Sequence, residues 1–330
     1  MGVFLPVSAR SAEPPERPAS PEAARGAEGE KGGAEGGEKA EKEEEESEER
    51  LELGLDLVLG WGKVPFAVEN APLSGAAGPT YSRADDVNSN VQSLLLGASY
   101  EVVEHLGVGV RVPFTFASFN PDGSGSRGAQ SFGNVELEGE YGRELGRGLK
   151  VYGAIGVALP TAVGDEIPDD LSNASAQLVD APSYDRFSLS RAAASARGYE
   201  DNALFEPHRL GIIPKVGAVY RLQGFSVEPY VKVENLVATT SLADSYVGEL
   251  VGAVRAGYEY RRLFEIAVKG LINVGFAGGD EDKQVAAAIA PELVLRFGPV
   301  RPYVGAIFPI AGPPLDNGFI GVRIGAGAAF

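Results

Sequence analysis

Segments of about ten residues in which apolar and polar side chains alternate recur from residue 51 to residue 330. LELGLDLVLGW (51–61) is the first of them, and GFIGVRIGAGAAF (318–330) is the last. A period of two places successive side chains on opposite faces of an extended strand. Twelve such segments are present, at 51–61, 91–103, 105–117, 132–144, 149–161, 208–222, 225–237, 246–261, 263–277, 283–297, 301–311 and 318–330. The sequence therefore predicts an all-β fold with an even number of strands.

The connections between these segments alternate between tight and long. Tight joints follow the even-numbered segments, at 104, 145–148, 223–224, 262 and 298–300. Longer ones follow the odd-numbered segments, at 62–90, 118–131, 162–207, 238–245, 278–282 and 312–317. Barrels of the bacterial outer membrane have short periplasmic turns and longer external loops. The pattern predicts a closed antiparallel transmembrane β-barrel of about 12 strands over 51–330, with both termini periplasmic.

The two faces of the predicted strands differ in chemistry. Leu53, Leu55 and Leu57 begin an aliphatic face that continues along the other segments. The opposite face carries the charges, which we treat as candidates for lining a pore: Arg111, Glu136, Glu138, Glu140, Lys215, Lys232, Glu234, Arg255, Lys269, Arg296 and Arg323. A soluble β-sandwich or barrel would point the apolar face inward instead, so parity alone leaves both alternatives open.

The aromatic residues separate these alternatives. On the apolar face they fall at both ends of the strands: Trp61, Phe114, Phe116, Phe276 and Phe308 at the loop ends, and Tyr100, Tyr141, Tyr220, Tyr258, Tyr260 and Phe297 at the turn ends. Two belts of aromatic rings around an aliphatic zone are typical of a protein that crosses both interfaces of a membrane. The sequence thus predicts a girdle in contact with outer-membrane lipid and lipopolysaccharide. Pro214, Pro229 and Pro291 lie within predicted strands, where we expect β-bulges.

Composition narrows the possible functions further. The chain has 330 residues, a net charge of −17 and no cysteine. Its acidity argues against nucleic acid as a partner, and the absence of cysteine excludes a disulfide framework and a thiol nucleophile. No apolar run approaches the roughly 18 residues of a transmembrane helix.

The first fifty residues differ from the rest. Residues 13–50 hold fourteen acidic and six basic residues, with no aromatic or β-branched side chain. Such a segment cannot offset the entropy of ordering, so we expect a disordered acidic periplasmic tail. Residues 1–12 contain a short apolar stretch followed by Val7-Ser8-Ala9, which fits a signal-peptidase site. We interpret them as the remnant of an export signal that starts upstream of Met1.

Two resemblances follow from these motifs. The C-terminal strand ending in Phe330 resembles the signature that the barrel-assembly machinery of Gram-negative bacteria recognises, which implies insertion in the outer membrane of such an organism. The stretch FGNVELEGEYGREL, followed by LKVYGAIGVALPTAVGD, is similar to a pattern of putative outer-membrane transporters associated with phenol and hydrocarbon degradation. Asn134 stands where that pattern usually has Asp, and Ala162 where it has Gly. Removing Phe330 should lower assembly in the membrane.

The residues predict no catalytic centre, metal site or cofactor, and we expect the protein not to be an enzyme. The two histidines, His105 and His208, lack a Ser two residues away, as the outer-membrane phospholipase site would require. GSGSRG (123–128) matches a phosphate-binding glycine pattern but lies between two predicted strands with no helix after it. The acidic pieces 164–170 and 278–282 could hold a divalent cation, but neither has the ligand spacing of a calcium loop, and solvated loop is the preferred interpretation.

The lumen and one long loop remain as candidates for function. A barrel of twelve strands is narrower than a general porin. The inward charges either pair and fill a polar interior or line a path for a solute. Residues 162–207 carry Tyr184, Phe187, Leu189, Tyr199 and the weakly helical SLSRAAASARG, so we hypothesise a constriction that folds over or into the mouth. The sequence predicts a narrow, porin-like channel or facilitator for an unknown small solute, apolar ones included; the alternative is a non-conducting structural or surface-interaction barrel.

Overall fold

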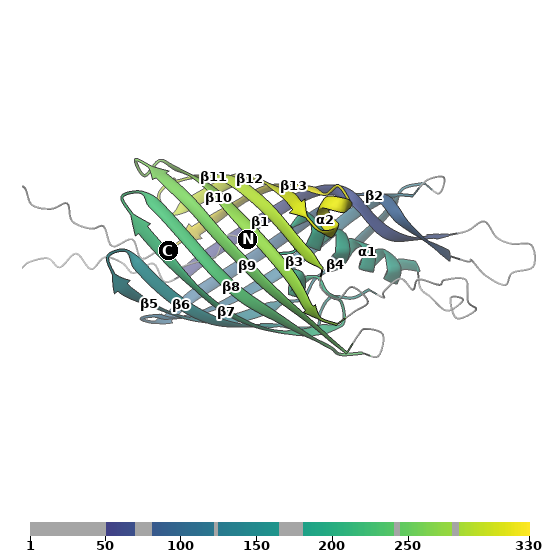
Figure 1. Ribbon diagram of the computed structural model, residues 1–330, viewed down its shortest axis with the longest axis horizontal. Helices are drawn as coiled ribbons and strands as arrows, with labels where there is room; N and C mark the ends of the chain where they lie inside the picture. The colour runs from purple at the N-terminus through teal and green to yellow at the C-terminus, as the bar shows by residue number, and fades with distance from the viewer. Residues whose placement is uncertain (1–50, 70–80, 122–124, 165–180, 241–244, 279–283) are drawn as a thin grey trace, which may run out of the picture.

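The computed structural model describes residues 51–69, 81–121, 125–164, 181–240, 245–278 and 284–330 (Figure 1). The first half of the wall consists of β1 (Leu51–Glu69), β2 (Tyr81–Val103), β3 (Leu106–Asn120), β4 (Arg127–Phe132), β5 (Glu136–Gly146) and β6 (Leu149–Ala158). The second half consists of β7 (Arg209–Leu222), β8 (Phe225–Ala238), β9 (Tyr246–Tyr260), β10 (Phe264–Ala277), β11 (Val285–Leu295), β12 (Val300–Ala311) and β13 (Ile320–Ala329). Three short helical elements accompany them, which are α1 (Ala181–Ala196), the 3-10 helix η2 (Asn202–Leu204) and α2 (Pro313–Asp316).

The strands form one closed antiparallel ring. Strands that follow each other in the chain pair, except β4 and β5, and β1 pairs with β13 from Glu52↔Ala329 to Trp61↔Ile320. The backbones of Leu51 and Phe330 exchange two hydrogen bonds, of 3.0 and 2.8 Å, where the ring closes. Because β4 and β5 both pair with β3, in succession along its length, they occupy one position in the wall. The wall therefore has the twelve strand positions that the alternation predicts.

The tight joints gather at one rim, the turn end, and the longer connections at the other, the loop end (Figure 1). At the turn end Gln223 and Gly224 both have positive φ, of 50° and 87°. That pairing of dihedral signs is what a two-residue hairpin turn needs to match the twist of its strands. No helix among the described residues is long and apolar enough to cross a membrane.

Two sequence expectations about the strands are wrong in detail. The predicted loops 62–90 and 118–131 are shorter in the structure. In the first, β1 extends to Glu69 and β2 begins at Tyr81; in the second, β3 extends to Asn120 and β4 begins at Arg127. The three prolines cause no β-bulge. At Pro214, Pro229 and Pro291 the ladder on one side is interrupted and then resumes in the same register, while the other neighbour stays paired. Proline removes one donor, and only one side of the strand needs that donor.

The outer surface has the composition that lipid requires. The aliphatic side chains of the predicted outward face are exposed, Leu53 and Ile155 among them. Ten of the eleven predicted girdle residues are exposed as well, and the eleventh, Phe114, is half-buried against Phe132 at a ring distance of 4.6 Å. The buried apolar residues instead gather inside the barrel, around α1.

Candidate functional site

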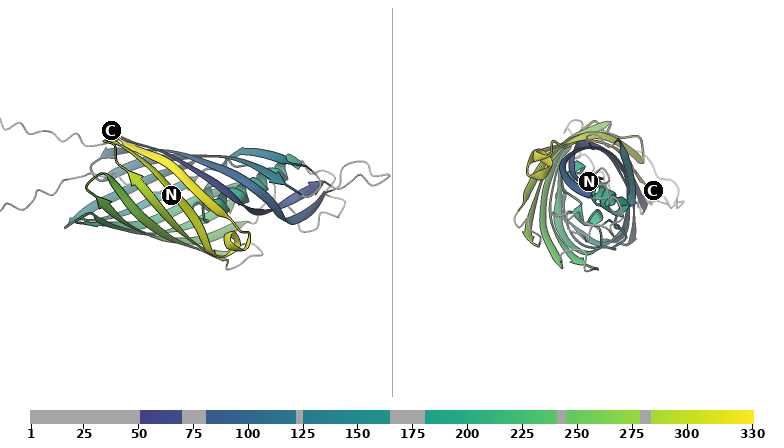
Figure 2. Two further views of the ribbon diagram at one scale, coloured as in Figure 1. Left: turned by 90° about the horizontal axis from the view of Figure 1, so that it is seen from above. Right: turned by 90° about the vertical axis from the view of Figure 1, so that its right-hand side faces the viewer.

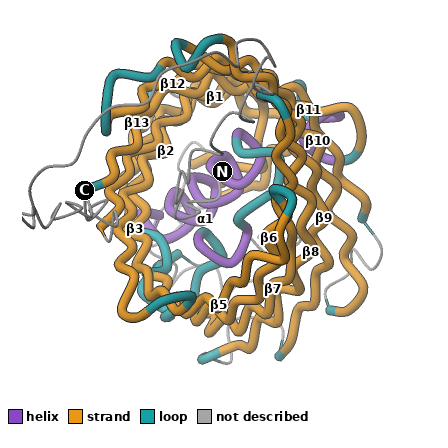
Figure 3. Tube along the Cα trace, turned by 90° about the vertical axis from the view of Figure 1, so that its left-hand side faces the viewer, coloured by secondary structure: helices purple, strands orange, loops and turns teal. Residues whose placement is uncertain are grey.

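The lumen contains a chain segment, residues 181–207, which we call the internal segment. It comprises α1, the turn 197–201, η2 and the return to β7. Seen along the barrel from either end, α1 lies within the ring of strands (Figures 2 and 3). All but a few of its described side chains are buried, although 182–200 contains four Ser and three Arg. Small side chains from Ala192 to Ala196 let a helix fit a lumen this narrow.

Two glycines of the wall allow the closest approach of α1. A Cβ atom on Gly60 would lie 2.4 Å from the Cβ of Ala196, and one on Gly321 would lie 2.5 Å from the carbonyl oxygen of Ala196. Gly60 and Gly321 are partners in the β1–β13 ladder. Adjacent glycines remove two side chains from one spot of the inner surface, and the end of α1 occupies that space.

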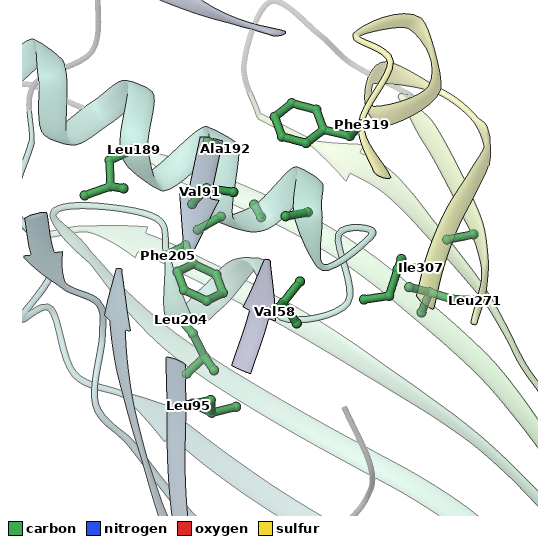
Figure 4. Packing of buried hydrophobic residues seen from close by; sticks show 14 of the residues in the cluster. Val58, Val91, Leu95, Leu189, Ala192, Leu204, Phe205, Leu271, Ile307 and Phe319 are labelled. Carbon is green, nitrogen blue, oxygen red and sulfur yellow. The ribbon is translucent and has the colours of Figure 1, made fainter. Parts of the chain in front are cut away.

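An apolar cluster packs the internal segment against the wall (Figure 4). Leu189, Leu204 and Phe205 of the segment are buried together with Val58 of β1 and Leu95 of β2. In the close view these side chains lie between the helix and the inner faces of the strands. Their burial removes apolar surface from water, which stabilises the docked segment by about 25 cal/mol for each Å² buried.

Arg197 binds the segment to the seam where the ring closes. Its Nη1 donates to Asp56 Oδ2 at 2.7 Å, and its Nε donates to Ser93 Oγ at 2.9 Å. The other carboxylate oxygen of Asp56 accepts from Arg323 Nε at 2.7 Å and from Tyr303 Oη at 2.8 Å. All five side chains are buried or partly buried. A buried carboxylate between two guanidinium groups has both its charge and its lone pairs satisfied.

Glu200 and Asp201 bind the segment to side chains of β3, β8 and β10. Lys269 Nζ donates to both carboxylate oxygens of Glu200, at 2.7 and 2.6 Å, and the hydroxyl of Tyr230 donates to Oε1. Asp201 Oδ1 accepts from Arg111 Nη1 at 3.1 Å and from Lys232 Nζ at 3.5 Å. Lys232 also contacts Glu234 at 2.6 Å, and the backbone N–H of Ala203 donates to Glu234 at 2.9 Å.

These cations keep both carboxyl groups ionised. Burial alone raises the pKa of Glu200, but the ammonium of Lys269 acts against it and the net pKa is lowered. Burial also raises the pKa of Asp201, and Lys232 together with Arg111 outweighs that effect, so its pKa lies well below the ordinary value. The turn 197–201 therefore presents fixed charges to the wall.

Asn134 supports the return of the segment. It lies, fully buried, between β4 and β5, where the expected single strand 132–144 is broken. Its Nδ2 donates to the carbonyl oxygens of Ala203 at 2.8 Å and Glu206 at 2.7 Å, and its Oδ1 accepts from the N–H of Ala162 at 2.8 Å. A carboxylate could make only the last of these bonds. The amide at this position is thus matched to the segment that it holds.

A cavity of about 70 Å³ lies on the turn-end side of Glu200 and Asp201. The strands β2, β3, β5, β7 and β8 line it, and its charged residues are Arg111, Glu136, Glu138, Lys215, Lys232, Glu200 and Asp201. Arg111 donates to Glu136, and Lys215 donates to Glu138 at 2.7 Å. The cavity therefore combines paired charges with apolar surface from Ala98, Val110 and Ile213, and it lies where the lumen meets the internal segment.

A second ion-pair network lies on β9, β10 and β11, nearer the turn end. Arg255 donates to Glu265 at 2.6 Å and to Glu292 at 2.7 Å. Arg296 Nη2 lies 2.8 Å from Glu259 and 3.2 Å from Glu265. The charges of the lumen are thus mostly paired across neighbouring strands.

The structure gathers the predicted pore-lining residues inside the barrel, in three groups. Seven of them lie at the cavity or at the internal segment: Arg111, Glu136, Glu138, Lys215, Lys232, Glu234 and Lys269. Arg323 lies at the seam, and Arg255 and Arg296 lie in the second network. Glu140 lies apart from these groups, 3.8 Å from Lys150. The residues that sequence reasoning missed are Arg197, Glu200 and Asp201. Their signal was present, since three charges occur within the five residues 197–201.

Within the described ranges, no three His, Asp or Glu side chains are arranged to hold a metal ion. His105 is in a tight turn, 3.4 Å from Glu104, and the carbonyl of His208 accepts from Thr239 at the loop end. The pieces 165–170 and 279–282, and residues 123–124 of the glycine pattern, lie outside the described residues.

Comparison with solved structures identifies the architecture. The COG4313 outer membrane channel from Pseudomonas putida F1 is similar over 85% of this chain and 96% of its own, at 12% identity and a TM-score of 0.54. The CymD monoaromatic hydrocarbon channel matches over 86% and 89% at 12% identity and a TM-score of 0.40. The translocator domain of the autotransporter NalP from Neisseria meningitidis matches over 85% and 88% at 10% identity and a TM-score of 0.42. No family model and no curated protein match the sequence. The first of these likenesses supports the fold alone, a closed antiparallel β-barrel.

Proposed function

We propose that the protein is a narrow passive channel for small solutes in the outer membrane of a Gram-negative bacterium, with the internal segment as its constriction. The observation that carries this proposal is the position of residues 181–207 inside the ring, bound to the wall by ion pairs at Arg197, Glu200 and Asp201. Selectivity in pores depends on such charged rings at the narrowest point.

The lining combines charged and apolar side chains. Carboxylates and cations bound the free volume next to the internal segment, and Ala98, Val110 and Ile213 line it as well. Passage of hydrocarbons, which the resemblance to degradation-linked transporters implies, stays a prediction. Since the short turns lie at the rim where Leu51 and Phe330 meet, we assign that rim to the periplasm.

Planar-bilayer recordings on the refolded barrel test the proposal. The wild type should give small, discrete conductance steps, and deletion of 165–205 should raise the unitary conductance severalfold because the constriction is removed. Deletion of 241–244, between β8 and β9, is the matched control and should leave the conductance unchanged.

The alternative is a non-conducting structural barrel, which the filled lumen also fits. A wild type that gives no current in bilayers and no swelling of liposomes would establish that alternative and sink the channel. Conductance that survives the 165–205 deletion unchanged would leave the channel but remove the internal segment as its constriction.

A further inference from the structure

Positive charge is concentrated at the turn end of the barrel, although the chain as a whole has a net charge of −17. The turns β5–β6, β7–β8, β9–β10 and β11–β12 follow one another around this rim. Residues 143–150, 219–226, 259–264 and 296–301, which form these turns, contain eight basic and two acidic residues. The turn β2–β3 contains Glu101 and Glu104 instead. The basic residues therefore form one arc of the rim.

The arc contains five exposed arginines, which are Arg143, Arg147, Arg221, Arg261 and Arg262. None of them forms an ion pair with another residue in the described part of the chain. Glu228 lies near Arg221, but it is paired with Arg255 at 3.6 Å. A guanidinium group without a carboxylate beside it attracts anions over about a Debye length, which is roughly 10 Å at 0.1 M salt.

Three of these arginines are placed away from lipid. Arg221 alternates with Tyr220 and Leu222, whose side chains are exposed on the outer face, so its parity is that of the lumen. Arg147 and Arg262 lie in the tight turns themselves, with φ of 54° and 58°. We call Arg147, Arg221 and Arg262 the basic turn residues. They come from three successive turns of the rim.

The other two arginines lie on the outer side. Arg143 shares the parity of Tyr141, a girdle residue, and the guanidinium of Arg261 lies 5.2 Å from the centre of the Tyr260 ring, which also belongs to the girdle. Long cationic side chains beside aromatic rings at a membrane interface extend to the lipid headgroups. Arg143 and Arg261 therefore provide a matched comparison for the basic turn residues.

The anionic group nearest to this arc in the chain is the acidic segment 13–50, which lies outside the described residues. It contains fourteen acidic and six basic residues, and seven of the fourteen fall within 41–50, directly before Leu51. Leu51 lies at the same rim, where its backbone bonds to that of Phe330. The far end of the arc, at β6, is eight strand positions from β1, or about 38 Å at 4.8 Å each, whereas an extended chain of thirty-eight residues spans up to about 125 Å. The segment can therefore reach every turn of the arc, at roughly the millimolar effective concentration that a tether gives.

We propose that the acidic segment 13–50 docks on the basic turn residues of its own chain. Its carboxylates then supply the anionic partners that Arg147, Arg221 and Arg262 lack among the described residues. Attachment at Leu51 favours this occupant over a separate protein. The positions of the three arginines, in the turns or on the lumen side, favour it over lipid headgroups. The contact forms at the rim whether or not the barrel conducts.

The chain has no cysteine, so Ala40→Cys provides a single attachment point for a nitroxide spin label. The labelled full-length barrel is refolded in micelles of a zwitterionic detergent without anionic lipid. Its spectrum should show an immobilised component at about 10 mM salt that disappears at about 1 M, since the Debye length falls from about 30 to about 3 Å. The joint replacement Arg147→Gln, Arg221→Gln and Arg262→Gln should abolish this component at low salt. Arg143→Gln combined with Arg261→Gln is the matched control and should leave most of it.

Replacement of Glu43, Glu44, Glu45 and Glu46 by Gln tests the other partner and should likewise make the label mobile, without changing the barrel. A label that is mobile in the wild type at low salt, an immobilised component that persists at high salt, or equal loss in the triple and the double variant would overturn the docking. Titration with short-chain phosphatidylglycerol tests the other occupant. If this lipid binds the wild type more tightly than the triple variant while the label stays mobile throughout, the three arginines bind lipid headgroups and the proposal is wrong.

Discussion

Gly60 of β1 and Gly321 of β13 stand opposite each other in the ladder, and the end of α1 rests on both of them at Ala196. The contact holds the helix close to the inner wall without any side chain from either strand. It therefore offers a way to displace the internal segment while leaving every charge of the lumen in place.

Gly60→Val should push α1 away from the wall, because the added Cβ alone would lie 2.4 Å from Ala196 Cβ and 2.8 Å from Val91. The expected result is a larger unitary conductance and faster amide exchange in 181–207. Gly270→Val is the control, since a Cβ at that outward position has no atom within 4 Å. Equal behaviour of the two variants would contradict the role given to this contact.

Arg197→Met should destabilise the docked segment, because it leaves Asp56 with one guanidinium and Ser93 with none. Removing one partner of a buried ion pair typically costs about 3–5 kcal/mol, and we expect the low end because Arg323 stays in place. Urea unfolding of the barrel in vesicles measures the loss. Arg143→Met, at an exposed position of β5, should cost little, and a similar loss in both variants would argue against a specific anchor.

Asn134→Ala should release the return of the segment to β7. The carbonyl groups of Ala203 and Glu206 would each lose a donor, at about 1–3 kcal/mol for every group that stays unsatisfied. Limited proteolysis should then cut within 197–207, while Asn88→Ala, at an exposed position of β2, should resist as the wild type does. Intact chains for both variants would mean that Asn134 is dispensable.

Acid should loosen the internal segment, but only well below neutral pH. Folded Glu200 and Asp201 have lowered pKa values, so their contribution is fully present above the ordinary carboxyl pKa of about 4 and is lost as pH falls through the folded values. Amide protection in 197–201 should therefore be constant from about pH 8 to 5 and decrease below about pH 4. Protection that decreases already between pH 7 and 6 would contradict the ion pairs described for these carboxylates.

The alternation of side chains was sufficient to predict the ring, because lipid outside and a polar lumen inside impose opposite chemistry on Leu53 and Asp56, three residues apart. It failed beyond residue 61, where β1 continues and Val64 and Phe66 are buried in the cluster that packs α1. The ion pairs could not be predicted. Arg197 and Asp56 are 141 residues apart, and their meeting depends on the register of the seam and on the depth of the helix.

The seam also sets an order of events. Asp56 belongs to the first strand of the wall and Arg323 to the last, and Arg197 binds the same carboxylate. Before β1 and β13 pair, Asp56 is separated from Arg323. A partly formed sheet therefore lacks the complete site that binds Arg197. The contacts that Arg197 makes at the seam are therefore complete only once β1 and β13 have paired. A helix with all of these contacts in place marks a ring that has closed.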